Sequence, residues 1–183
     1  RTVTGVQTCA LPILGLESGS PKILKIMQKG ATVDMGRKAV ALSRKYIREI
    51  EASFIFGYIG EDRDTIRDTV RFAKEIGVMP STFIATPFPG TELYRMAMEK
   101  GRIVDEEAYL STLDKVSIFG GNSLNLTDLS ADEARQAIKE AIKEITRYYF
   151  IKYPAIPFRR LVSSLREYGL ARTVCKVFNK VKI

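Results

Sequence analysis

Hydrophobic and polar positions along the chain follow two patterns, short contiguous apolar runs and longer stretches with helical spacing. The contiguous runs are LGLES from Leu14, SFIF from Ser53 and the start of STFIATPFPGTELY from Ser81. Each run is followed by a stretch that favours a helix. Short apolar runs are typical of buried strands, and apolar residues every three or four positions are typical of helices that lie on a sheet. The pattern therefore predicts strand and helix in alternation.

Proline, glycine and capping residues mark the expected helix ends. Pro21 begins the first predicted helix, PKILKIMQK, and Gly30 ends it. The second helix lies within residues 33–50. The third follows Asp64 and stops at Gly77. We expect the buried stripe of the second helix to consist of Ala39, Leu42, Tyr46 and Ile50.

Strand and helix in units of this length predict an α/β fold with a parallel sheet, whose ligand site lies at the carboxyl ends of the strands. The three predicted strands end at Glu17 and Ser18, at residues 57–61 and at residues 86–91. These segments contain the unusual residues of the chain, and we expect them to converge on one edge.

Two explanations compete for the residues that follow the second strand. Gly57 and Gly60 would let a flat ligand approach the backbone, because glycine has no Cβ, or they are ordinary turn glycines. Glu61 would accept hydrogen bonds from free backbone amides near the next helix, or it simply caps that helix. Pro87 and Gly90 are equally explained as chain breakers. Only the placement of all these residues at strand ends favours a ligand site.

Composition excludes several kinds of chemistry. The 183 residues are 45% hydrophobic, enough for one core or for one core with a helical tail. Histidine is absent from the sequence, and Cys9 and Cys175 lie far apart, which excludes a Ser-His-Asp triad, zinc-finger spacing and a disulfide framework. No apolar run approaches the roughly 18 residues of a membrane span. We therefore expect a cytoplasmic protein.

Residues 1–13 look foreign to the rest of the chain. VTGVQTCALPI, residues 3–13, back-translates codon by codon into a DNA-sequencing adapter. We interpret residues 1–13 as a read-assembly artefact fused to a gene fragment, and we expect the natural protein to extend further upstream. The alternative is an ordinary irregular N-terminus.

Three segments occur in a characteristic order and spacing, GLESGSPKILKIMQKG, SFIFGYIGE and TPFPGTELYRMAMEKGRI. Together they resemble the second half of the radical SAM barrel, and the resemblance covers residues 14–103. The methylthiotransferase-like and cobalamin-dependent branches are the most similar. The resemblance implies the carboxyl-terminal half of a partial (βα)6 TIM-like barrel with three parallel strands. It also implies an enzyme in which a [4Fe–4S] cluster cleaves S-adenosylmethionine reductively.

The resemblance assigns S-adenosylmethionine contacts residue by residue. It implies that Glu17 and Ser18 contact the ribose or amino acid portion, and that Lys29 pairs with the carboxylate. Apolar and backbone contacts to adenine would come from Ile55 and Gly57. The residues bordering adenine at the third strand end would be Thr86, Pro87 and Phe88.

The family's three closely spaced cluster cysteines are missing from this sequence. Without three thiolates no cluster is held, so we expect the chain to be inactive alone and to be a truncated fragment. The resemblance also implies an electron donor for the full-length enzyme and admits cobalamin in the missing upstream region. The resemblance admits a small-molecule or a macromolecular substrate.

Residues 104–183 are predicted to form an irregular connector and a helical region. Ser130 and Glu133 make a capping box for a helix that runs through Tyr149. Nine basic residues and one acid, Glu167, follow from position 147 onward and account for the whole formal charge of +8. The basic tail packs on the barrel, contacts anionic membrane peripherally, or binds nucleic acid phosphates. The competing function is therefore a non-catalytic α/β module whose tail binds membrane or nucleic acid.

Overall fold

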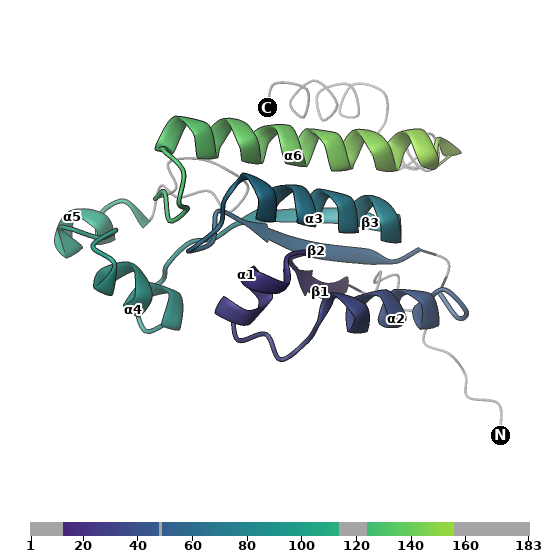
Figure 1. Cartoon of the computed structure of the whole chain (residues 1–183), viewed down its shortest axis with the longest axis horizontal. Coiled ribbons are helices and arrows are strands. Elements are labelled where there is room, and N and C mark those ends of the chain that lie inside the picture. The colour runs from purple at the N-terminus through teal and green to yellow at the C-terminus, as the bar shows by residue number, and fades with distance from the viewer. Residues whose placement is uncertain (1–12, 48, 114–123, 156–183) are drawn as a thin grey trace, which may run out of the picture.

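The computed structural model describes residues 13–47, 49–113 and 124–155 and has an α/β fold with three parallel strands (Figure 1). The elements are β1 (Ile13–Glu17), α1 (Pro21–Ile26), α2 (Val33–Ser43), β2 (Glu51–Phe56), α3 (Arg63–Ile76), β3 (Met79–Ile84), α4 (Glu92–Glu99), α5 (Glu106–Leu110) and α6 (Ala131–Lys152). The predicted alternation of strand and helix is confirmed.

The sheet has the order β1-β2-β3, and its register decides which residues share a face. Gly15 pairs with Ser53 and Ser53 with Ser81, so these three residues lie on one face, which we call the small-residue face. Leu14 and Ala52 pair on the opposite face. All three carboxyl ends lie at one edge because the strands are parallel, and the predicted convergence of the strand ends is therefore confirmed.

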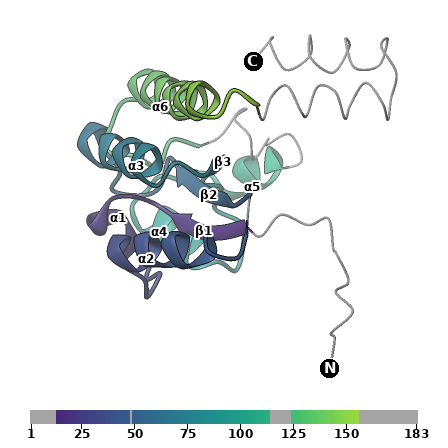
Figure 2. The ribbon, with the colours of Figure 1, turned by 90° about the vertical axis from the view of Figure 1, so that its right-hand side faces the viewer.

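The main core lies between the other face of the sheet and helices α2, α3 and α6. Figures 1 and 2 show α3 and α6 side by side on this face. Phe54 of β2 meets Phe72 of α3 edge to face, with ring centroids 6.3 Å apart. Ala141 and Ile145 of α6 are buried in the same core.

Capping residues define the ends of the two longest helices. Asp62 caps α3 in a capping box with Thr65, and Gly77 ends the helix in the left-handed conformation at φ 55°. Ser130 and Glu133 form the predicted capping box of α6. The end of α3 and the start of α6 therefore lie where their sequence signals put them.

The second helix departs from the prediction in length and in its buried stripe. α2 ends at Ser43, and its buried residues are Gly36 and Val40. Of the predicted stripe, Leu42 and Tyr46 are exposed, Ala39 is half-buried, and Ile50, which lies beyond the helix, is buried. The reason is close packing, because a Cβ on Gly36 would lie 3.1 Å from Phe72. The helix therefore turns its glycine toward α3 rather than its larger side chains.

The connector and the first helix also differ in detail from the prediction. α1 ends at Ile26, before the predicted stop, and Gln28 follows with φ 51°. The connector contains the short helix α5, whose Tyr109 joins a second apolar cluster with Ala97 and Leu126. Cys9, Cys175 and the basic tail beyond residue 155 lie outside the described residues. Among the helices of the described residues, none is both long and apolar enough to cross a membrane.

Candidate functional site

Glu17 and Lys29 form an ion pair at the carboxyl end of β1. The Lys29 Nζ donates to Glu17 Oε1 at 2.8 Å, and the two side chains are 34% and 17% exposed. A Cβ on Gly15 would lie 2.8 Å from the same Oε1 atom. Glu17 therefore folds back over Gly15, which places the pair on the small-residue face.

An apolar floor lies on the same face, on the neighbouring strands. Ile55 of β2 pairs with Phe83 of β3, two positions beyond the Ser53–Ser81 pair, so both side chains point to the small-residue face. Both are partly buried. Phe83 and Gly15 were not among the predicted site residues, although the alternation of side chains along each strand places both on this face.

The turn after β2 is closed by a buried carboxylate. Glu61 is fully buried, and its Oε2 accepts a hydrogen bond from the Gly57 amide at 2.6 Å. The other oxygen, Oε1, has no hydrogen-bond partner among the described residues. The helix cap is Asp62 instead, whose Oδ1 accepts from the amides of Asp64 and Thr65. Glu61 thus accepts a hydrogen bond from a backbone amide, as expected. The donor is Gly57, which precedes Glu61 in the turn, and not an amide of α3.

Burial dominates the electrostatics of this turn. It raises the pKa of Glu61 to about 7, although the amides of Gly57 and Tyr58 act in the opposite direction. The pKa of Asp62 is shifted in the opposite direction, because Lys22 donates a hydrogen bond to its carboxylate at 2.8 Å. That bond and the amide of Thr65 lower the pKa of Asp62 to about 2.

The backbone conformation at position 57 explains why the residue there is a glycine. Its φ is 79°, a region that residues with a Cβ rarely adopt. A Cβ there would make ordinary contacts with Ile84 and Ile138, at 3.5 and 3.6 Å. The missing Cβ of this glycine therefore faces packed side chains, and the positive φ is what requires glycine here. A ligand contact to the Gly57 backbone stays a prediction.

Ser18 is buried and engaged within the protein. Its hydroxyl lies 3.0 Å from Thr69 Oγ1 and accepts from the Ser20 amide. The Gly19 amide donates to the same threonine oxygen. A Cβ on Gly19 would lie 2.6 Å from the Asp68 carbonyl. This segment holds β1 and α1 against α3, and the Ser18 side chain does not reach the surface.

The three residues predicted at the end of β3 differ in their exposure to solvent. Pro87 is fully buried, and its carbonyl accepts a hydrogen bond from the Tyr109 hydroxyl at 2.8 Å. Thr86 is partly buried, and Phe88 is exposed. Of the three residues predicted here, Thr86 and Phe88 therefore present side chains to solvent. The structure brings Glu17, Lys29 and Ile55 to the same edge of the sheet.

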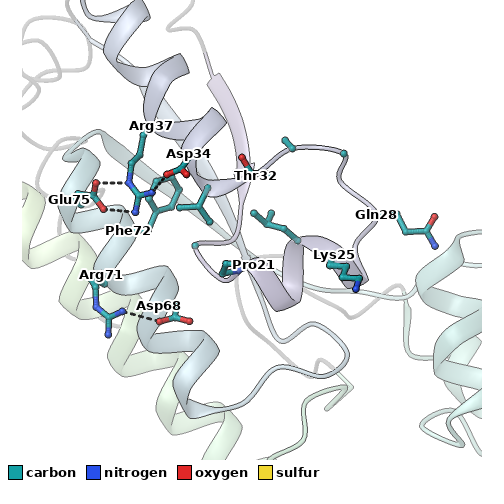
Figure 3. A pocket seen from close by; sticks show the side chains of 15 residues that line it. Pro21, Lys25, Gln28, Thr32, Asp34, Arg37, Asp68, Arg71, Phe72 and Glu75 are labelled. Carbon is teal, nitrogen blue, oxygen red and sulfur yellow. Dashed lines mark hydrogen bonds and ion pairs between the residues drawn. The ribbon is translucent and has the colours of Figure 1, made fainter.

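A cavity of about 740 Å³ lies elsewhere, between α1, α2 and α3 (Figure 3). Phe72 lies in the cavity wall. Both arginines of the lining are paired with carboxylates, Arg37 with Asp34 and Glu75, and Arg71 with Asp68. None of the predicted site residues lines it. No group of His, Cys, Asp and Glu suited to a metal ion occurs within the described part of the chain. The strand ends remain the candidate site because the predicted residues gather there.

Comparisons with known proteins found relatives but no matching family model. An uncharacterized methyltransferase of Pyrococcus horikoshii is 37% identical over 91 residues, which are 49% of this chain and 20% of that protein. Bacteriochlorophyllide d C-12(1)-methyltransferase of Chlorobaculum tepidum is 30% identical over 58% of this chain and 24% of its own length. The tRNA-2-methylthio-N(6)-dimethylallyladenosine synthase of Baumannia cicadellinicola is 33% identical over 45% of this chain and 19% of its own length.

These are names of radical SAM enzymes. The relatives therefore point to an enzyme of this kind at the level of the family. The matches span a quarter or less of the length of each of these relatives.

Proposed function

We propose that the chain forms the carboxyl-terminal half of a radical SAM barrel and contributes contacts to S-adenosylmethionine. The observation that carries this proposal is the Glu17–Lys29 ion pair at the end of β1, on the small-residue face. Ile55 lies on the same face, and the ends of β2 and β3 lie at the same edge. Three strand ends would thus line one nucleoside site, in line with the names of the relatives.

The residues at this edge fit the chemistry of S-adenosylmethionine. Its amino acid portion is a zwitterion, and a neighbouring carboxylate and ammonium can exchange their mutual contact for the two ends of a zwitterion. Lys29 would meet the ligand carboxylate, and Glu17 would meet the α-ammonium or the ribose hydroxyls. Ile55, the backbone at Gly57, Thr86 and Phe88 would border the adenine ring. Ser18 and Pro87 would act through packing, because both are buried.

The chain does not fit the [4Fe–4S] cluster. A cluster, when bound, supplies the electron that cleaves the sulfonium, and it requires three thiolates from the protein. The sequence has two cysteines, Cys9 and Cys175. We therefore infer that the cluster, any cobalamin, and the surface that meets an electron donor belong to another part of a longer protein. The chain alone would then be inactive.

The complete gene tests this proposal. We expect a CxxxCxxC run within about 100 residues upstream of Leu14, because the cluster needs closely spaced thiolates. We also expect the complete protein to bind S-adenosylmethionine in equilibrium dialysis. An upstream region without such cysteines would contradict the proposal, and so would failure of the complete protein to bind the ligand.

A further inference from the structure

The end of the molecule opposite to the candidate site carries exposed apolar side chains. Four of them come from the carboxyl ends of two helices. They are Leu42 in the last turn of α2 and Tyr46 just after it, 57% and 82% exposed, and Phe150 and Ile151 at the end of α6, 39% and 68% exposed. We call these four residues, together with Lys45 and Lys152, the basic-aromatic end. Large apolar side chains in groups of this kind mark contact surfaces.

Specific contacts bring the two helix ends together at Gly77. Arg44, which follows α2, donates to the carbonyls of Ile76 and Gly77 at the end of α3. Lys152 Nζ of α6 lies 2.9 Å from the position of a Cβ on Gly77. Figure 1 shows α2, α3 and α6 ending on the same side of the molecule, and Figure 2 looks onto that side. The basic-aromatic end is therefore a single region of the surface.

Aromatic packing orders the last turns of α6. The buried ring of Tyr149 lies 5.1 Å from Tyr153 and 5.8 Å from Phe150, between ring centroids. Lys152 Nζ lies over Tyr148 and Tyr153, 5.5 and 5.9 Å from the ring centroids. The exposed Phe150 ring is thus held in place before any partner binds, which lowers the entropy lost on docking.

The charge of this region is positive. Lys45 and Lys152 form no ion pair within the described residues, whereas Lys22, Lys29 and Lys74 elsewhere do. The acids nearest this end in sequence are Glu49 and Glu51, at the start of β2. From position 147 onward the sequence contains nine basic residues, Lys152 among them, and one acid. A partner that complements this surface must be anionic and must also accept aliphatic side chains.

We propose that the basic-aromatic end docks on an anionic lipid bilayer. Tyr46, Phe150, Leu42 and Ile151 enter the interface between headgroups and acyl chains, and Lys45 and Lys152 meet the lipid phosphates. Nucleic acid accounts for the charge but not for the aliphatic side chains, since its bases stack on aromatic rings. Because the strands are parallel, the candidate site at their carboxyl ends then faces away from the bilayer. The proposal does not depend on S-adenosylmethionine binding.

Vesicle cosedimentation of the full chain tests this docking. The probes are vesicles of phosphatidylcholine alone and vesicles with added phosphatidylserine, at about 0.1 M and about 0.5 M salt. We expect binding to the anionic vesicles that weakens at the higher salt. The double variant Tyr46→Ser with Ile151→Ser should bind anionic vesicles about tenfold more weakly. In the double variant Lys45→Gln with Lys152→Gln, each lost lysine should weaken the binding about fivefold.

Matched controls lie at the other end of the molecule. Val104→Ser with Leu110→Ser removes two apolar side chains that are 92% and 41% exposed, and Lys25→Gln with Lys100→Gln removes two cations. Both control variants should bind vesicles as the parent does, and all variants should keep the parental melting temperature. If the variant Tyr46→Ser with Ile151→Ser binds anionic vesicles as tightly as the parent does, the proposal is overturned. Binding to single-stranded RNA without binding to anionic vesicles would overturn it as well, in favour of a nucleic acid partner.

Discussion

Glu17 and Lys29 meet at 2.8 Å, although they lie twelve positions apart in the chain with helix α1 between them. Glu17 adopts φ 61°, which is uncommon for a residue with a side chain. Backbone conformations of this kind cost about 1 kcal/mol or more and persist where the surroundings enforce them, often at functional sites. The end of β1 is therefore built to hold a carboxylate over the small-residue face.

A methyl group on Gly15 should disrupt this ion pair. The Cβ of Gly15→Ala would lie 2.8 Å from Glu17 Oε1 and 3.3 Å from Lys29 Nζ. Both groups are the far ends of flexible side chains, so the free energy of unfolding should fall by less than about 1 kcal/mol. The affinity of the complete protein for S-adenosylmethionine, measured by calorimetry, should nevertheless decrease. Ser53→Ala changes the same face without adding atoms and should leave the affinity intact; equal affinities in both variants would count against a role for the pair.

Glu61 should make the protein less stable as the pH rises through the weakly acidic range. Its pKa is about 7 in the folded chain, and its ordinary value is 4.5, so the folded state binds the proton more tightly. The resulting stabilisation is complete below pH 4.5 and is lost as the pH rises toward 7. The loss should reach about 3 kcal/mol in urea-unfolding experiments.

Glu61→Gln should flatten this part of the pH profile. The exposed carboxylate of Glu92 pairs with Arg95, and Glu92→Gln is the control that should keep the slope. Asp62 does not interfere, because its pKa of about 2 lies below its ordinary 3.8, so its contribution is lost only as the pH falls through that lower range. A parent protein whose stability does not change between pH 4.5 and 7 would show that Glu61 is not the buried acid described.

Ser18 should matter for folding rather than for ligand binding. Ser18→Ala leaves the Ser20 amide without its hydroxyl partner and removes the contact with Thr69, which should lower the free energy of unfolding by about 1–3 kcal/mol. The affinity for S-adenosylmethionine should stay the same in the complete protein. A weaker affinity for S-adenosylmethionine with an unchanged free energy of unfolding would instead indicate that Ser18 contacts the ligand directly.

Gly19 should tolerate no side chain. A Cβ would lie 2.6 Å from the Asp68 carbonyl and from Phe72 Cβ, so α1 and α3 would have to separate. We expect Gly19→Ala to destabilise the protein by about 3 kcal/mol in thermal or urea unfolding. Gly90 is the matched control, because its φ of 82° is strained for alanine but its surroundings are open. Gly90→Ala should cost about 1 kcal/mol, and equal losses at both positions would contradict the packing described.

Local signals in the sequence were sufficient to predict much of the fold. The helix stop at Gly77 and the capping box of Ser130 and Glu133 depend on residues close in sequence, and both are confirmed. The parallel sheet followed from the alternation of strand and helix. Each of these features has a short-range physical cause, so it is readable without knowledge of the packing.

Features set by long-range packing were not predictable in this way. Apolar spacing placed Leu42 and Tyr46 in the buried stripe of the second helix, but the close approach of Gly36 to Phe72 decides which side of the helix packs. The same limit applies to the candidate site. Glu61 could have capped α3, and only the folded turn shows that it binds the Gly57 amide while Asp62 takes the cap.

The affinity of the complete protein for S-adenosylmethionine tests the central claim most directly. Glu17→Ala and Lys29→Ala each remove one charged hydrogen-bonding group, and each should weaken binding about tenfold or more. The Lys22–Asp62 ion pair has the same length, 2.8 Å, and links α1 to the start of α3, so Lys22→Ala is the matched control. We predict weaker binding in the first two variants and parental binding in the third. Parental affinity in Glu17→Ala and Lys29→Ala would contradict the placement of the ligand at this edge of the sheet.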